Sequence, residues 1–296
     1  MKKATDRLEN SGASLITDTP VKTNNRKSRV GKYLSFFKIR FSAGLQYRAA
    51  AIAGVVTQFF WGLMEIRMFM AFYRSDPSAI PMEWDSLVSY IWLQQALLAM
   101  FMLWFFDNSI FDEISSGGVA LELCRPCDIY SMWFVKNCAV RLSKTLLRCI
   151  PMFIITFFLP EGYRMSLPVD ITRFLLFFVS LWLGFIVVIA ISMPVYISAF
   201  YTLSPMGVRL MVSTIGEFCS GAIVPLPFLP DGVQRIFNLL PFASMQSTPF
   251  LIWGGSLDLY GSLYAIALQI FWAAALILLG RLWMRAALKR VVLLGG

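Results

Sequence analysis

The chain alternates between long apolar stretches and shorter polar ones. Six stretches are apolar over the roughly 17 to 25 residues that a helix needs to cross about 30 Å of hydrocarbon. They cover residues 49–73, 87–106, 143–159, 171–195, 207–224 and 261–280. The third carries Arg148 and Pro151, and the fifth carries Glu217, so these two are the least regular. The pattern predicts an all-α integral membrane protein with six transmembrane helices.

Two different segments precede the first apolar stretch. Residues 1–30 are polar and lack the apolar core of a signal peptide, which predicts a flexible cytoplasmic tail before a membrane domain at 31–296. Residues 33–47 predict an amphipathic helix that lies along the cytoplasmic leaflet. Its apolar positions recur at helical spacing, at Phe36, Phe37, Phe41 and Leu45. The alternative is that this helix only extends the first span inward.

Charge sets the orientation of the predicted spans. The chain has 296 residues, 58% of them apolar, and a formal net charge of +9. With the N-terminus inside, 21 of the 26 lysines and arginines face the cytoplasm and four face the other side. This asymmetry predicts that both termini are cytoplasmic. It favours contact with anionic membrane lipids over nucleic-acid binding.

The segment at 114–130 separates the second and third apolar stretches. Gly117 and Gly118 interrupt the chain, a run that includes Glu122 and Arg125 can form a short helix, and Pro126 ends it. We therefore expect a short, isolated helix at the membrane surface. It can receive force from a separate protein, or it can be an ordinary surface helix.

The segment that follows the fifth apolar stretch is apolar but broken by prolines. Pro225 and Pro230 end one helical run, and Pro241 and Pro249 interrupt the next. Unpaired backbone groups cost several kcal/mol each in lipid, so such a segment must pack against protein or line a cavity. A re-entrant helical hairpin over residues 225–250 meets that requirement.

Charged side chains inside the apolar stretches are candidates for a substrate path or gate. Glu65 and Arg67 fall about 25 Å beyond Arg48, near the outer interface, where they can also simply reach the headgroups. Glu217 falls near the bilayer centre, where a carboxylate either contacts substrate or is protonated and bonded to another helix. Together with Pro225 and Pro230, these residues form the predicted gate set.

Several kinds of catalytic chemistry find no support in the sequence. The chain has no histidine, which removes Ser-His and Cys-His catalysis. Cys124 and Cys127 form a single C-x-x-C without a second pair, so no metal or redox site is expected. No G-x-x-x-x-G-K-[ST] motif occurs, so this chain does not hold ATP in a P-loop. We expect no cofactor in this chain.

The motifs "SGGVALELCRPCDIY" and "GAIVPLPFLP", with the ending "RAALKRVVLLGG", resemble those of ABC-2 type ATP-binding cassette permeases. The resemblance covers the chain from about residue 31. It implies a six-helix export permease of the bacterial cytoplasmic (inner) membrane, with a coupling helix after the second span and a re-entrant hairpin after the fifth. The coupling residues it implies are Gly117, Gly118, Glu122, Arg125 and Pro126. Cys127 departs from the small or aliphatic residues common in the family.

The same resemblance implies a complex. Two copies of a separate ATPase subunit bind ATP and Mg, and a second permease chain, identical or homologous, completes the membrane part. Two alternatives come from other classes: a membrane-embedded lipid-modifying enzyme and a non-enzymatic scaffold. The richest acidic group available to an enzyme is Asp107, Asp112 and Glu113, near the end of the second span.

Overall fold

A computed structural model describes residues 25–75, 81–125, 127–202 and 204–294. Every regular element in these ranges is a helix, which confirms the all-α prediction for this part of the chain. The helices are α2 (Asn25–Gly44), α3 (Arg48–Ser75), α4 (Trp84–Ala96), α5 (Leu98–Phe101), α6 (Asn108–Ser115), α7 (Val119–Leu123), α8 (Ile129–Phe157), α9 (Ile171–Ser198), α10 (Met206–Cys219), the 3-10 helix η2 (Leu226–Phe228), α11 (Asp231–Leu239), α12 (Ser247–Trp253) and α13 (Leu259–Leu294). Most of the predicted tail, and Pro126 of the predicted coupling segment, lie outside the described residues.

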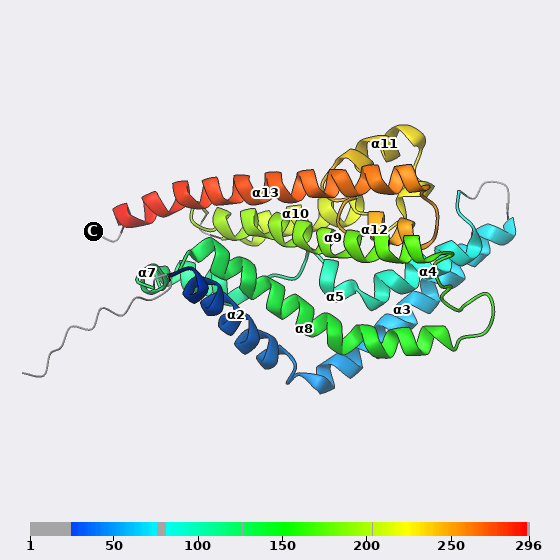
Figure 1. Cartoon of the computed structure of the whole chain (residues 1–296), viewed down its shortest axis with the longest axis horizontal. Coiled ribbons are helices and arrows are strands. Elements are labelled where there is room, and N and C mark those ends of the chain that lie inside the picture. Colours follow the sequence, from blue (N-terminus) through cyan, green and yellow to red (C-terminus); the bar gives the residue numbers. More distant parts are fainter. Residues whose placement is uncertain (1–24, 76–80, 126, 203, 295–296) are drawn as a thin grey trace, which may run out of the picture.

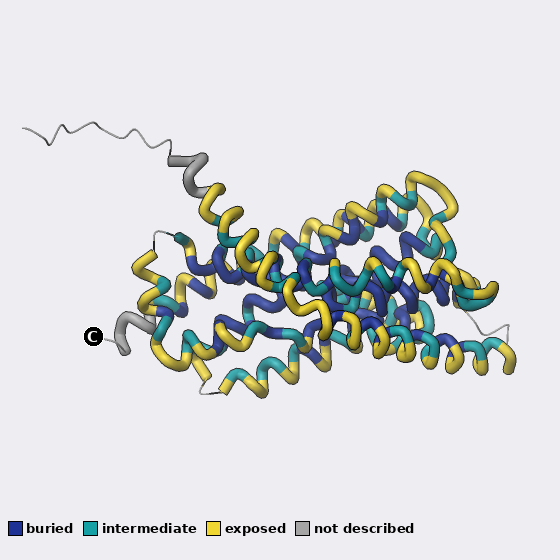
Figure 2. Tube along the Cα trace, turned by 90° about the horizontal axis from the view of Figure 1, so that it is seen from below, coloured by how far each residue is buried: buried dark blue, intermediate teal, exposed yellow. Residues whose placement is uncertain are grey.

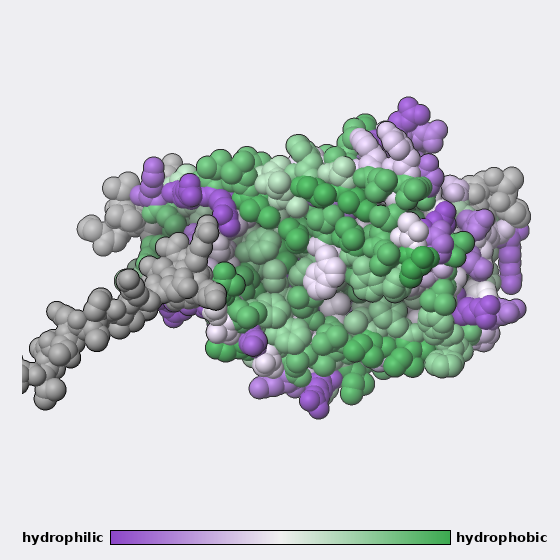
Figure 3. Space-filling view, viewed as in Figure 1, coloured by the Kyte–Doolittle hydropathy of each residue, from purple (hydrophilic) through white to green (hydrophobic). Residues whose placement is uncertain are grey.

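The helices form an elongated bundle whose two ends differ (Figure 1). The start of α2, the short α7 and the last turns of α13 lie at one end, here named the α7 end. The opposite end carries α11 and the last turns of α3, and is named the α11 end. Hydrophilic side chains gather towards both ends, and the surface between them is mainly hydrophobic (Figure 3). This distribution is typical of a protein that crosses a bilayer.

Within the described residues, three helices are long and apolar enough to cross a membrane: α3, α9 and the part Leu259–Lys289 of α13. The other predicted spans have different forms. α10 has 14 residues, which extend about 21 Å and fall short of the hydrocarbon thickness. α8 is long enough but carries Lys136, Arg141, Lys144 and Arg148. The membrane character is thus shown by three helices, and the count of six stays a prediction.

The second predicted span, 87–106, is not one continuous helix. α4 ends at Ala96, the helix is interrupted at Leu97, and α5 ends at Phe101. The following residues, up to Asp107, form no regular helix. The stretch is apolar apart from Ser89, Gln94 and Gln95, and it contains no proline or glycine that would mark the break at Leu97. The third predicted span also begins much earlier than expected, because α8 starts at Ile129.

Buried side chains form two clusters along the bundle, and the tube view shows the buried positions running through its interior (Figure 2). The larger cluster is built mainly from α4, α9 and α12, with Trp92 and Phe250 among its members. The smaller cluster lies towards the α7 end. It contains Phe106, Ile110, Phe111, Val119, Ile129, Tyr130, Trp133, Met193, Val195, Tyr196, Ile197, Met284 and Ala287. The α7 end therefore has a core of its own.

The predicted amphipathic helix is present as α2, which starts earlier than expected and packs along α8. Phe36, Phe37 and Phe41 are half-buried, whereas Lys38 and Arg40 are exposed. Leu34 and Ile39 are exposed as well, so the division into an apolar and a polar face is only partial, and the position of this helix along the cytoplasmic leaflet stays a prediction.

The proline-broken segment has two parts with different surroundings. Gly221 has φ of +79°, which favours glycine, and turns the chain after α10. The first helix of the pair, α11, has no buried residue, whereas every residue of α12 is buried. The expectation that this segment packs against protein is met by α12 and not by α11. Its re-entry into a membrane stays a prediction.

Candidate functional site

The candidate coupling segment is formed by α6, α7 and the turn between them. Asp107 caps α6 by accepting hydrogen bonds from the Ser109 backbone N–H at 3.0 Å and the Ser109 hydroxyl at 2.8 Å. α6 ends before Gly117, whose φ of +75° favours a residue without a side chain. Gly118 then begins α7, which is only five residues long. The two glycines therefore separate a short helix, as the sequence predicted.

The short helix α7 is fixed to α8. Its first residue, Val119, is buried in the core of the α7 end. The indole N–H of Trp133 donates to Glu122 Oε2 at 2.9 Å. Glu122 thus faces the protein, although the sequence grouped it with Arg125 as a residue of the coupling surface. It holds the helix in place, and Arg125 is the charged member of the pair that is exposed.

A second anchor joins α6 to α8 and α9. The Lys136 ammonium donates to the Ser109 hydroxyl at 2.6 Å and lies 3.3 Å from Asp107 Oδ2. The Tyr196 hydroxyl accepts from the Asp107 backbone N–H at 2.8 Å and donates to Asn137 Oδ1 at 3.1 Å. Lys136 is almost fully buried, so its charge is paired rather than solvated. Both anchors come from the first turns of α8.

The outer face of α7 presents apolar and basic groups. Leu121 is 74% exposed and Leu123 is 41% exposed. Arg125 and Cys124 are exposed beside them. An exposed apolar side chain next to a cation, on a rigid support, is suited to a protein partner.

Glu113 lies beneath this face with one carboxylate oxygen buried and without a hydrogen-bond partner among the described residues. Burial raises the pKa of Glu113, the charge on Lys136 opposes the shift, and the nearby Glu122 and Asp107 carboxylates add to it. The three acidic residues considered for an enzyme, Asp107, Asp112 and Glu113, thus have different surroundings. Asp107 caps α6 and pairs with Lys136, and Asp112 is exposed.

Arg141, further along α8, is a functional candidate that the sequence pattern did not single out. Its guanidinium is fully buried and donates to the carbonyls of Met100, Met102 and Phe105 at 3.3, 2.8 and 3.1 Å. These carbonyls belong to the break after α4. The side chain also donates to the Ser192 hydroxyl of α9 at 3.3 Å. The available signal was its spacing, since residues 133, 137 and 141 share one face of a helix.

The predicted gate set is only partly brought together. Glu65 Oε2 accepts from Gln95 Nε2 of α4 at 3.4 Å. The neighbouring Gln94 donates to the carbonyl of Ala222, in the turn after α10. The two glutamines therefore connect α3 with the turn before η2. Arg67 is not part of this connection, because its guanidinium lies over the Tyr163 ring, 5.2 Å from the centroid.

The other three members of the gate set lie around η2. Glu217 is half-buried on α10, and its Oε1 has no hydrogen-bond partner among the described residues. Pro225 is buried and precedes η2, whereas Pro230 is exposed and precedes α11. Phe69 of α3 packs on Phe228 of η2 with ring centroids 5.1 Å apart. Among the described residues, no hydrogen bond or ion pair joins Glu217 to Glu65 or Arg67.

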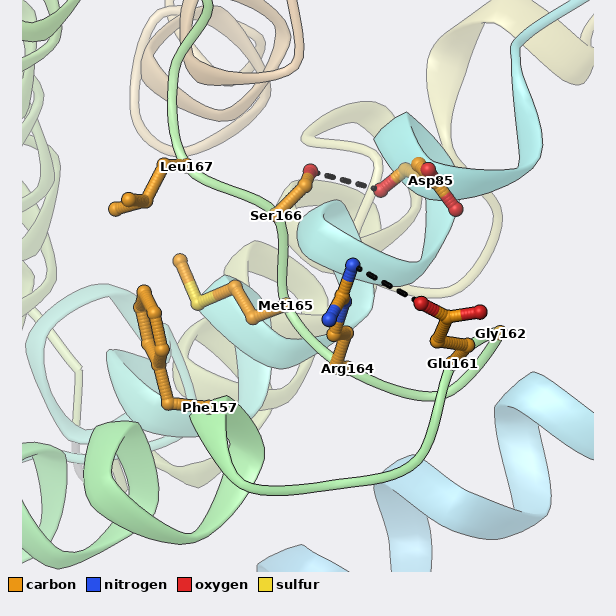
Figure 4. Close-up of a pocket in the computed structure, with 8 residues that line it drawn as sticks. All are labelled: Asp85, Phe157, Glu161, Gly162, Arg164, Met165, Ser166 and Leu167. Atoms are coloured by element: carbon orange, nitrogen blue, oxygen red, sulfur yellow. Dashed lines mark hydrogen bonds and ion pairs between the residues drawn. The ribbon is translucent and has the colours of Figure 1, made fainter.

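A pocket outside the predicted site residues lies at the α11 end (Figure 4). It has a volume of about 590 Å³ and is lined by the loop after α8 and the start of α4. Arg164 and Glu161 pair across 3.6 Å, and the Ser166 hydroxyl donates to the Asp85 carbonyl at 3.4 Å. None of the sequence-predicted site residues lines it.

Among the described residues no group of three or more histidine, cysteine or acidic side chains could hold a metal.

Two comparisons bear on the identity of the chain. No curated protein matches the chain. The family model described as "ABC-2 family transporter protein" matches residues 59–292, from the first long helix to the last. The match covers most of the chain and includes α6, α7 and η2, so the protein belongs to the ABC-2 family of transporter proteins.

Proposed function

We propose that this permease exports its substrate outward across the bacterial cytoplasmic membrane when a separate ATPase binds and hydrolyses ATP. In this proposal two ATPase subunits dock at the α7 end, and a second permease chain, identical or homologous, completes the path. ATP and Mg are bound by the partner and not by this chain.

The observation that carries the proposal is the way α7 is held. A surface helix that receives force must be rigid and must be joined to the helices that move. α7 is joined to α8 through Glu122 and Trp133, and Val119 is inserted into a core shared by α8, α9 and α13. An ordinary surface helix has no need of a buried aromatic partner for its carboxylate.

The route from α7 into the membrane runs along α8. Trp133 holds α7, Lys136 holds α6, and Arg141 holds the broken end of the second apolar stretch. A displacement of α7 therefore acts on the same helix that binds the carbonyls at the end of the second apolar stretch. The gate set Glu65, Arg67, Glu217, Pro225 and Pro230 belongs to the outward part of the proposed path.

The docking site is tested by crosslinking. A photoreactive residue at Leu121 is expected to capture an ATPase subunit in cells. Ile236 of α11 is the control, because it is also apolar and 62% exposed but lies at the α11 end. Equal capture from both positions, or capture of no ATPase from position 121, contradicts the proposal.

Coupling is tested in the purified complex. Arg125→Glu is expected to reduce transport-linked ATP hydrolysis by about tenfold, the effect of losing one charge-assisted contact worth roughly 1.5 kcal/mol. Arg164→Glu, an exposed charge reversal at the α11 end, is the matched control and is expected to leave hydrolysis unchanged. The chain alone is expected to show no ATP hydrolysis.

A further inference from the structure

The bend between α2 and α3 forms one wall of a basic pocket, and α8 forms the other. The pocket has a volume of about 480 Å³. Its lining contains three cations, Arg40 from α2 and Lys144 and Arg148 from α8, and no acidic residue. The remaining lining is small or apolar, with Tyr47 at the bend.

The three cations have no ion-pair partner of their own among the described residues; the Asp107 carboxylate acts on Lys144 but is paired with Lys136. None of them forms an ion pair or a side-chain hydrogen bond in the described part of the chain. The Lys144 ammonium lies 3.4 Å from the centroid of the Phe105 ring, which positions it without removing its charge. Lys144 and Arg148 are four residues apart on α8, a spacing at which like charges repel. An anion between them relieves that repulsion.

Small residues keep the pocket open. Gly54 of α3 faces the Arg148 guanidinium so closely that an added Cβ would lie 2.7 Å from its Cζ. Gly54 itself does not line the pocket, whereas Ala43, Ala50 and Ala51 do. These residues let the guanidinium extend between α3 and α8.

The pocket lies where a membrane interface is expected. Arg48 begins α3, which is long and apolar enough to cross a bilayer, and the bend places the basic part of α2 just before it. Beyond the pocket, α3 and α8 present exposed apolar side chains, including Ile52 and Ile150. A basic pocket bordered by exposed apolar helix surface suits a ligand with an anionic head and acyl chains.

We propose that this pocket binds the phosphate of an anionic phospholipid. Arg40, Lys144 and Arg148 surround the phosphate, and the acyl chains lie along the apolar faces of α3 and α8. The lipid then holds α2 against α8, the helix that carries the anchors of α7. This assignment does not depend on the proposed export function, because lipid binding needs no nucleotide.

The test uses the full-length chain in detergent and native mass spectrometry. Phosphatidylglycerol is titrated against phosphatidylcholine, and bound lipid is counted. Each basic residue near a membrane surface contributes about a fivefold factor to binding of an anionic lipid. Lys144→Gln/Arg148→Gln is therefore expected to weaken phosphatidylglycerol binding about 25-fold. Lys32→Gln/Lys38→Gln removes the same charge from exposed positions of α2 outside the pocket and is expected to change it less than threefold.

A second variant fills the pocket without changing charge. Ala43→Trp is expected to reduce phosphatidylglycerol binding, while circular dichroism and the elution volume match those of the wild type. Glycerol 3-phosphate and inorganic phosphate form the soluble arm of the test. Equal binding of either at the lipid's concentration would assign the pocket to a soluble phosphate and overturn the lipid assignment. Unchanged phosphatidylglycerol binding in folded Lys144→Gln/Arg148→Gln would overturn it as well.

Discussion

The indole N–H of Trp133 and the carboxylate of Glu122 meet at 2.9 Å, and this contact joins α7 to α8. Trp133 is also stacked on Phe200, with ring centroids 6.1 Å apart and planes 8° from parallel. The loop after α9 therefore helps to fix the orientation in which the indole donates to Glu122. Together with the buried Val119, this side chain connects the exposed tip of α7 to the helices behind it.

Removing this hydrogen bond is expected to loosen α7 without unfolding the bundle. Trp133→Phe keeps an aromatic ring in the core but leaves the Glu122 carboxylate without its donor, at a cost of about 1.5–3 kcal/mol. Faster amide hydrogen exchange is expected in residues 119–125 and not in α9. Trp104→Phe is the control, because Trp104 is 53% exposed and its side chain donates no hydrogen bond within the described part of the chain. Equal exchange in the Trp133→Phe and wild-type proteins would show that α7 is held by other contacts.

Arg141 is expected to be the most sensitive basic position in the chain. Arg141→Met leaves three backbone carbonyls without their donor, and each unsatisfied buried group costs about 1–3 kcal/mol. The thermal midpoint in detergent should fall markedly. The thermal midpoint of Arg141→Lys should lie between those of Arg141→Met and the wild type, since a single ammonium cannot replace a planar guanidinium that binds several carbonyls.

The control for Arg141 is Arg235→Met. Arg235 is exposed on α11, and its loss should leave the midpoint within a degree or so of the wild type. A wild-type midpoint for Arg141→Met would mean that the break after α4 does not depend on this arginine.

Glu113 is expected to make the coupling segment sensitive to pH. Because burial raises its pKa in the folded protein, folding favours the protonated carboxyl. That stabilisation is present below the ordinary glutamate pKa of about 4.3 and is lost as pH rises through the raised value. Hydrogen exchange in α6 and α7, corrected for intrinsic rates, should therefore become faster between acid and neutral pH.

Glu113→Gln should remove most of this dependence, because the amide is neutral at every pH. Asp112→Asn is the control, since Asp112 is adjacent but exposed. If the dependence persists unchanged in Glu113→Gln, another group is responsible for it.

The contact between α9 and the segment before α12 depends on Gly184. An added Cβ at Gly184 would overlap the backbone carbonyl of Met245, which cannot move as a flexible side chain can. Gly184→Ala is therefore expected to destabilise the protein by about 1–3 kcal/mol. Gly232→Ala is the control, because a Cβ there meets nothing within 4 Å. A thermal midpoint equal to that of the wild type for Gly184→Ala would contradict this close approach.

Much of the architecture is readable from local pattern alone. The apolar runs that became α3, α9 and α13 are long, nearly free of charge and unbroken by glycine turns, so hydrophobicity alone predicts them. The glycine pair at 117–118 and the prolines at 225 and 230 interrupt helices for backbone reasons that act within a few residues. These features needed no knowledge of distant contacts.

The break after α4 and the inward direction of Glu122 were decided only by the tertiary structure. Residues 97–106 are as apolar as the helix before them. The carbonyls of Met102 and Phe105 accept hydrogen bonds from the Arg141 guanidinium of α8, a contact that local pattern does not reveal. The residues next to Glu122 in the sequence do not predict whether its carboxylate faces the protein or the solvent. Its hydrogen-bond partner, Trp133, belongs to the next helix. Local hydrophobicity and backbone stereochemistry determined where helices form in this protein, whereas long-range polar contacts decided where one helix breaks and which way its charges face.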